Sequence, residues 1–256
     1  MTQRPVRFVL LSHHHSGEEV LRRGLAQHPQ VRMYGELFHA SPDERQRAVG
    51  PDGARYELGD EGSAYLQRTL SGPGGCELAV GFVMAYANAR ADRFMLTAWD
   101  YLIQDTDIRV LHLTRRNLLE YQVAMEVAHR TEGWFDPLDH DVAYQVEPFS
   151  LPTGACRQEF DRLVTLGLWV KQAFARHRVL NIEYEQDIVA NPRRALSRIC
   201  NFIGVDPAAP QVKSWTPSPR PGPNPAKQLI NFEELREDFR YTPYESLFEP
   251  DPAGAP

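Results

Sequence analysis

Short apolar runs alternate with amphipathic stretches along most of the chain. Residues 6–11, a mostly apolar run that ends at polar Ser12, are typical of a buried strand in a parallel sheet. Residues 17–27 then carry apolar side chains on one face, which predicts a helix. The same alternation continues, with strands expected at 77–83, 108–113 and 178–182 and helices at 91–103, 117–131, 157–176 and 192–203. This order favours an α/β fold, a three-layer sandwich with a central parallel sheet and helices on both faces.

The chain organisation indicates one domain over residues 1–256. Residues 207–228 are rich in proline, but too little chain follows them to build a second domain, so we interpret them as a surface loop. Residues 249–256 are expected to form a frayed tail. The 256 residues, 42% of them hydrophobic, are enough for a core that needs no disulfides or metals.

Net charge and cysteine content narrow the possible partners. The net charge of −6 gives no reason to expect binding to nucleic acid or to an anionic membrane, although a local basic pocket for a small anion remains allowed. Cys76, Cys156 and Cys200 are widely spaced, so we expect reduced thiols that are mostly buried. No apolar run reaches transmembrane length and no signal peptide is evident, which predicts a cytoplasmic protein.

The loop Ser12-His-His-His-Ser-Gly-Glu-Glu19 connects the first expected strand to the first expected helix. A Ser-Gly pair in such a place can aim backbone N–H groups at an anion above the helix N-terminus. The P-loop signature Gly-x4-Gly-Lys-Ser/Thr is absent. Taken alone, the pair is also explained by a tight turn with Ser16 as the helix N-cap.

Three further segments follow along the chain, and their order matters for the interpretation. Residues 110–124 form an apolar strand, then two arginines, then a helix. Residues 179–188 read Val-Leu-Asn-Ile-Glu-Tyr-Glu-Gln-Asp-Ile, and residues 231–245 include Asn-Phe-Glu-Glu-Leu-Arg and Thr-Pro-Tyr-Glu. Together with the first loop, these segments resemble the sulfotransferases that use 3′-phosphoadenosine 5′-phosphosulfate (PAPS). The resemblance runs from residue 7 to about residue 248.

This resemblance implies a P-loop NTPase-like architecture and a set of site residues. The loop would bind the donor's 5′-phosphosulfate, and the two arginines would bind its 3′-phosphate bidentately. In the segment Tyr34-Gly-Glu36, Glu36 matches the position of a base that takes the acceptor hydroxyl's proton, although a surface carboxylate explains it equally well. His15 is the second catalytic candidate. The implied residues for PAPS or its product PAP are His14, His15, Ser16, Gly17, Glu18, Arg115, Arg116 and Ala124.

The chain departs from the family's pattern at the donor site. The loop's Arg or Lys is His15, its second hydroxyl residue is Glu18, and the Ser that shares the 3′-phosphate is Ala124. Many relatives also carry Lys where Val83 stands. The carboxylates at 18 and 19 would compete with a phosphosulfate for the same N–H groups. Each lost charge-assisted hydrogen bond is worth roughly 1.5–3 kcal/mol, so donor binding could be weaker by several powers of ten.

A metal site is the alternative interpretation of the histidines. His13, His14 and His15 with His39 and Glu36 offer ligands that transition metals accept. Three consecutive residues of an extended loop cannot all point one way, so we expect no metal.

Three functions remain open at this stage. The first is a PAPS-dependent sulfotransferase that acts on a hydroxyl of a small-molecule or carbohydrate acceptor. The second is a non-catalytic binding or scaffold protein that has lost PAPS binding, which the altered loop favours and Arg116 opposes. The third is a P-loop kinase-like nucleotide enzyme, which lacks the P-loop Lys-Ser/Thr and a clear Mg²⁺ carboxylate.

Overall fold

The computed structural model describes residues 4–38, 61–71, 77–86, 93–131, 146–209 and 224–249. The chain divides into two compact units, which are described separately. The first comprises Met1–Thr114 and Trp169–Pro219, and the second comprises Arg115–Leu168 and Arg220–Pro256. The single domain expected over residues 1–256 stays a prediction.

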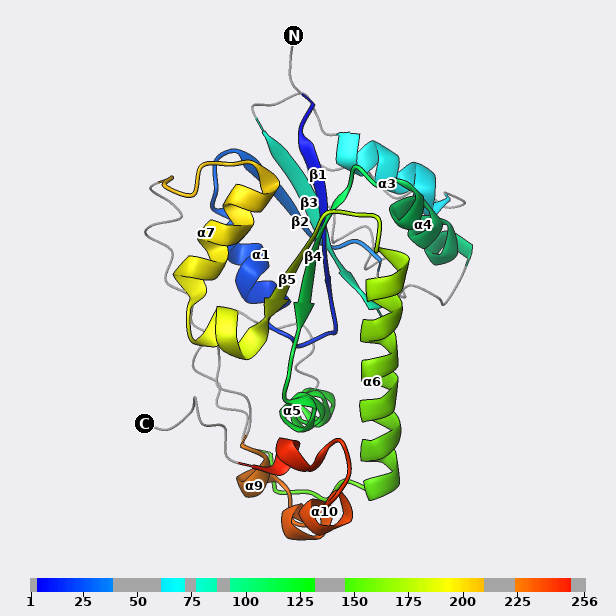
Figure 1. Cartoon of the computed structure of the whole chain (residues 1–256), viewed down its shortest axis with the longest axis vertical. Coiled ribbons are helices and arrows are strands. Elements are labelled where there is room, and N and C mark those ends of the chain that lie inside the picture. Colours follow the sequence, from blue (N-terminus) through cyan, green and yellow to red (C-terminus); the bar gives the residue numbers. More distant parts are fainter. Residues whose placement is uncertain are drawn as a thin grey trace. The chain divides into compact units, whose positions relative to one another are not determined.

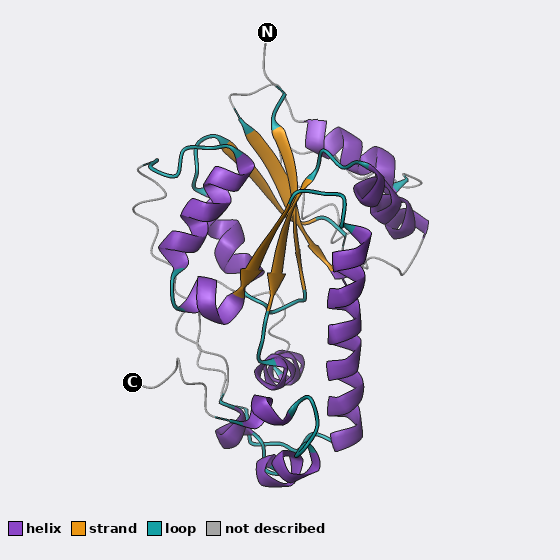
Figure 2. Cartoon of the chain, in the orientation of Figure 1, coloured by secondary structure: helices purple, strands orange, loops and turns teal. Residues whose placement is uncertain are grey.

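A five-stranded parallel sheet forms the centre of the first unit (Figures 1 and 2). The spatial order of its strands is β2-β3-β1-β4-β5, so β1 lies in the middle and two neighbours flank it on each side. The α/β class and the parallel sheet predicted from the sequence are confirmed. The strands are β1 (Val6–Ser12), β2 (Val31–Glu36), β3 (Ala79–Ala85), β4 (Arg109–Thr114) and β5 (Val179–Glu183).

Helices cover both faces of this sheet (Figure 1). Helices α1 (Glu18–Ala26) and α7 (Pro192–Ile203) pack on one face, where Phe8, Leu10 and Leu111 join the main apolar cluster. On the other face lie α3 (Gly62–Ser71) and α4 (Arg93–Gln104), with the last turn of α6 (Thr153–Ala173). The central strands β1, β3 and β4 are therefore mostly buried on both faces, which explains why they read as apolar runs. The edge strand β5 is exposed at Val179 and Asn181.

Most of the expected elements are present, with shifted ends. Helix α7 matches the helix expected at 192–203, with Pro192 in its first turn, and it ends where Gly204 adopts a left-handed φ of 81°. Helix α6 begins at Thr153 rather than at 157. Helix α3 and the π-helical turn η2 (Tyr184–Val189), which follows β5 directly, were not predicted.

The second unit is helical. Helix α5 (Leu118–Arg130), most of α6, α9 (Pro225–Gln228), α10 (Phe232–Asp238) and the 3₁₀ turn η3 (Glu245–Phe248) enclose a separate apolar cluster. The Asn117 side chain caps α5 by accepting a hydrogen bond from the Glu120 N–H at 3.0 Å. Most of the proline-rich segment, residues 210–223, and residues 250–256 of the expected tail lie outside the described residues.

Two of the three cysteines and the hydropathy of the described helices bear on the predictions from the sequence. Cys156 and Cys200 are buried and reduced, as expected, whereas Cys76 lies outside the described residues. None of the described helices combines the length and the apolar character that a membrane span requires. The cytoplasmic location stays a prediction.

Candidate functional site

The loop between β1 and α1 lies at the carboxyl edge of the sheet's central strand. Strand β1 ends at Ser12 and α1 begins at Glu18. Two residues between them have left-handed backbones, His15 with φ 55° and Gly17 with φ 90°. Successive N–H groups in such a conformation point to one side and form a concavity that binds anions. The loop therefore has the backbone of an anion site although the P-loop lysine is absent.

Gly17 is packed beneath an aromatic ring. Tyr184, at the start of η2, is 7% exposed, and a Cβ at position 17 would overlap its ring. Asp187 holds this turn, because its carboxylate accepts hydrogen bonds from the Glu183 N–H at 3.0 Å and from Arg198 at 2.5 Å. The Tyr-Glu-Gln-Asp segment therefore has a physical role at the loop that the sequence pattern did not reveal.

We expect Gly17→Ala to lower the free energy of unfolding by about 1–3 kcal/mol, because alanine disfavours this φ and its methyl group meets the Tyr184 ring. The measurement is urea unfolding of the variant and the unaltered protein. Gly167→Ala is the matched control, since a Cβ at that α6 position has no neighbour within 4 Å. If Gly17→Ala unfolds at the same urea concentration as the unaltered protein, the described loop packing is wrong.

The anion that the loop holds is its own Glu18 carboxylate. Glu18 accepts hydrogen bonds from the His15 N–H at 3.0 Å and from the Ser16 N–H at 2.8 Å, one on each oxygen. Burial raises the pKa of the Glu18 carboxyl above its ordinary value. Through these two hydrogen bonds, Glu18 occupies the N–H groups for which the sequence predicts competition with a phosphosulfate.

Two neighbours of Glu18 differ from their sequence interpretation. Ser16 is not the N-cap of α1: Gly17 occupies that position, and the buried Ser16 hydroxyl has no hydrogen-bond partner among the described residues. Glu19 does not reach the loop's N–H groups in the described contacts. It pairs with Arg22 at 2.5 Å and with Arg23 at 2.7 Å, which lowers the pKa of its carboxyl although burial opposes this.

Glu36 lies beside the loop. It is the last residue of β2, and its Oε2 is 3.7 Å from Nδ1 of His14. Both side chains are partly accessible, with 18% of Glu36 and 26% of His14 exposed. A carboxylate that is next to an anion-binding loop and open to solvent can take a proton from an incoming hydroxyl. Its sheet partner is the apolar Val83.

The arginines and Ala124 belong to the second unit. Arg115 is buried and pairs with Glu120 of α5 at 3.0 Å, so it helps to hold the start of that helix. Arg116 is exposed, and Ala124 is partly buried on the same helix. The loop and Glu36 belong to the first unit. The structure therefore brings His14, Ser16, Glu18 and Glu36 together in that unit, whereas the two arginines belong to the second unit.

The described residues offer no cluster of three or more His, Cys, Asp or Glu side chains suited to a metal ion. His39, part of the alternative metal set, lies outside them. The ring of the loop's His13 lies edge-on to that of Tyr86, with 4.4 Å between the ring centroids.

The chain is similar to known proteins along nearly its whole length. It is 30% identical over 254 residues to Nodulation protein H of Rhizobium tropici, covering 98% of this chain and 96% of the relative. It is 28% identical over 253 residues to Nodulation protein H of Rhizobium meliloti (strain 1021), covering 96% of each. No family model matches the chain.

Among solved structures, the fold is similar to that of a sulfotransferase from Alicyclobacillus acidocaldarius. The TM-score is 0.51 at 20% sequence identity, and the match covers 93% of this chain and 92% of that one. At this identity the likeness concerns the arrangement of helices and strands.

Proposed function

Because the chain belongs to the sulfotransferase family, with Nodulation protein H as its relative, we propose that it transfers a sulfuryl group from PAPS to a hydroxyl of a small-molecule or carbohydrate acceptor. The observation that carries this proposal is the loop after β1, whose N–H groups already hold a pair of anionic oxygens. A sulfuryl or phosphate group presents oxygens of the same kind.

The loop fits the donor only when Glu18 leaves it. The carboxylate stands in for two oxygens of the phosphosulfate, so the donor and Glu18 exclude each other at the N–H groups of His15 and Ser16. Once the carboxylate is displaced, these groups and Gly17 would hold the anion, with the buried Ser16 hydroxyl as a further donor. His14 and His15 would supply the positive charge that the family's Arg or Lys supplies elsewhere.

Glu36 would act as the general base. The acceptor's oxygen forms a bond to sulfur while the bond from sulfur to the donor's phosphate oxygen breaks, and PAP leaves. Glu36 takes the hydroxyl proton as this happens, and nearby His14 would keep the carboxylate oriented. Catalysis would rest on positioning and on charge stabilisation by fixed N–H groups.

Arg116 would hold the 3′-phosphate of the donor. It is exposed, whereas Arg115 is buried, so of these two arginines Arg116 is the one we assign to the phosphate. Ala124 would add no hydrogen bond there.

The proposed reaction is tested by incubating the protein with ³⁵S-labelled PAPS and a panel of small alcohols and sugars. Transfer of label that requires both the protein and an acceptor supports the proposal. If the protein neither transfers label nor binds PAP, the proposed function is wrong.

We expect Arg116→Ala to weaken PAP binding by about 10- to 100-fold, the loss of one bidentate charge-assisted contact. Thermal shift with added PAP measures the effect. Arg162→Ala, which removes a surface pair with Glu159, is the control and should leave the PAP-induced shift unchanged. An equal shift for Arg116→Ala and the unaltered protein would contradict the assignment.

A non-catalytic binding protein is the second candidate, and one observation favours it. The Glu18 carboxylate accepts the hydrogen bonds of the loop's His15 and Ser16 N–H groups without any bound PAPS, as expected of a site that has lost its ligand. Absence of both PAP binding and transfer to the acceptor panel would favour this candidate.

A further inference from the structure

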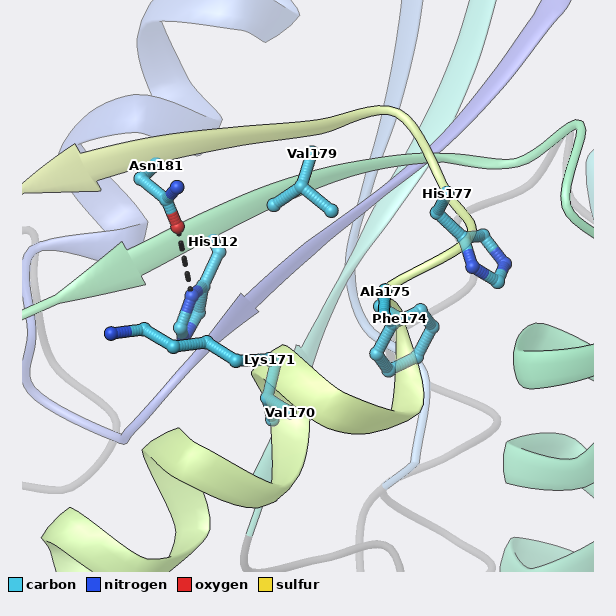
Figure 3. Close-up of a pocket in the computed structure, with 8 residues that line it drawn as sticks. All are labelled: His112, Val170, Lys171, Phe174, Ala175, His177, Val179 and Asn181. Carbon is cyan, nitrogen blue, oxygen red and sulfur yellow. Dashed lines mark hydrogen bonds between the residues drawn. The ribbon is translucent and has the colours of Figure 1, made fainter.

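A pocket of about 290 Å³ opens between the end of α6 and strands β4 and β5 of the first unit (Figure 3). His112 of β4 and Asn181 of β5 stand side by side in the sheet register and line it. Lys171 and Phe174 line it from α6 and the residues just after that helix. None of these side chains belongs to the proposed donor loop.

The protonation of His112 follows from its neighbour. Its Nδ1 lies 3.2 Å from the Asn181 Oδ1, and an amide oxygen only accepts hydrogen bonds, so Nδ1 carries the proton. Nε2 therefore carries no proton and can accept a hydrogen bond through its lone pair. His112 is 1% exposed, and Nε2 has no hydrogen-bond partner among the described residues. Burial lowers the pKa of His112 and the Lys171 ammonium adds to this, while the hydrogen bond with Asn181 opposes it. The net shift is downward, which favours the neutral ring.

A buried acceptor without a partner is unfavourable, so an occupant of the pocket gains by bringing a donor to Nε2. The exposed Lys171 lines the same pocket with an ammonium group that can donate to an occupant, and the described structure shows no hydrogen bond between the two side chains. A hydroxyl suits both side chains, since its proton can go to Nε2 while its oxygen accepts from Lys171. A sulfate or carboxylate would instead place its lone pairs against that of Nε2.

Apart from His177, whose Nε2 lies 2.9 Å from the Leu102 carbonyl oxygen, the rest of the lining is apolar. Phe174, Val170 and Val179 offer a surface on which the C–H face of a sugar ring can pack. The pocket is also linked to the donor loop by a row of rings. Tyr86 lies 5.9 Å from His112 and 4.4 Å from His13, measured between ring centroids, and the buried Tyr86 hydroxyl has no hydrogen-bond partner among the described residues.

We propose that this pocket binds a neutral sugar ring through one of its hydroxyls, with His112 as acceptor and Lys171 as donor. As a subsite for one ring of the acceptor, this role rests on the proposed sulfotransferase function. Binding of the sugar itself does not require the donor, so the two proposals can fail separately.

The test is NMR of the imidazole nitrogens in ¹⁵N-labelled protein without PAP. The probe is methyl α-D-glucopyranoside, and sodium sulfate is the comparison. Absence of the signal in His112→Gln assigns it to His112. We expect the glucoside, and not sulfate, to shift the Nε2 signal in a saturable way. A shift with sulfate instead, or with neither compound, would overturn the proposal.

Variants separate binding from mere packing. His112→Leu should weaken glucoside binding, measured by ligand-detected NMR, by about tenfold, while His112→Gln should restore part of it because its amide oxygen still accepts. Asn181→Asp should protonate His112 and exchange the preference, so that sulfate binds and the glucoside weakens. Unfolding curves check that the variants fold. Equal glucoside affinity in folded His112→Leu and the unaltered protein would also overturn the proposal.

Discussion

Replacing Glu36 by Gln is expected to lower kcat for sulfuryl transfer by about 10²–10⁴-fold, the usual worth of a positioned general base. The amide keeps the shape of the side chain beside His14 but cannot take the acceptor's proton. PAP affinity should be unchanged, because Glu36 is not among the groups that we assign to the donor's anion. The measurement is ³⁵S transfer at saturating PAPS, with PAP binding followed in parallel.

The control for this prediction is Glu126→Gln, which removes a carboxylate paired with Arg130 on the surface of α5. It should transfer sulfuryl groups at the unaltered rate. If Glu36→Gln is as active as this control, Glu36 is a surface carboxylate and the base lies elsewhere.

Glu18→Ser should tighten PAP binding by about 10- to 100-fold. The change frees two N–H groups from a competing carboxylate and provides a hydroxyl in its place. Glu19→Gln is the matched control, since the neighbouring carboxylate is engaged by Arg22 and Arg23 instead of by the loop. An equal gain from both variants would mean that net charge near the loop, rather than the two hydrogen bonds, governs affinity.

The fold could be predicted from the sequence because the central parallel strands are mostly buried on both faces. Runs such as Val6–Ser12 and Ala79–Ala85 consist mostly of apolar residues, which is the pattern expected of buried strands. The missed elements lack such a signal. Helix α3 contains Gly62, Ser63 and Ser71, which are weak helix formers, and η2 depends on hydrogen bonds of Asp187 that no periodicity encodes.

The candidate site was predictable in its residue types but not in its contacts. A carboxylate at position 18 can be seen to oppose an anion, yet only the left-handed backbone at His15 and Gly17 turns two N–H groups onto it. The approach of His14 to Glu36 depends on strand order, which brings segments far apart in the sequence to one edge of the sheet. The tautomer of His112 likewise depends on its register with Asn181.

The central claim is that the loop after β1 is a donor site whose N–H groups Glu18 now holds. Calorimetric titration of PAP into the unaltered protein and into Glu18→Ser tests it most directly. We predict measurable but weak binding to the unaltered protein, and binding at least about tenfold tighter to the variant at the same stoichiometry. Absence of PAP binding to both proteins, or equal affinity in the two, would contradict the claim.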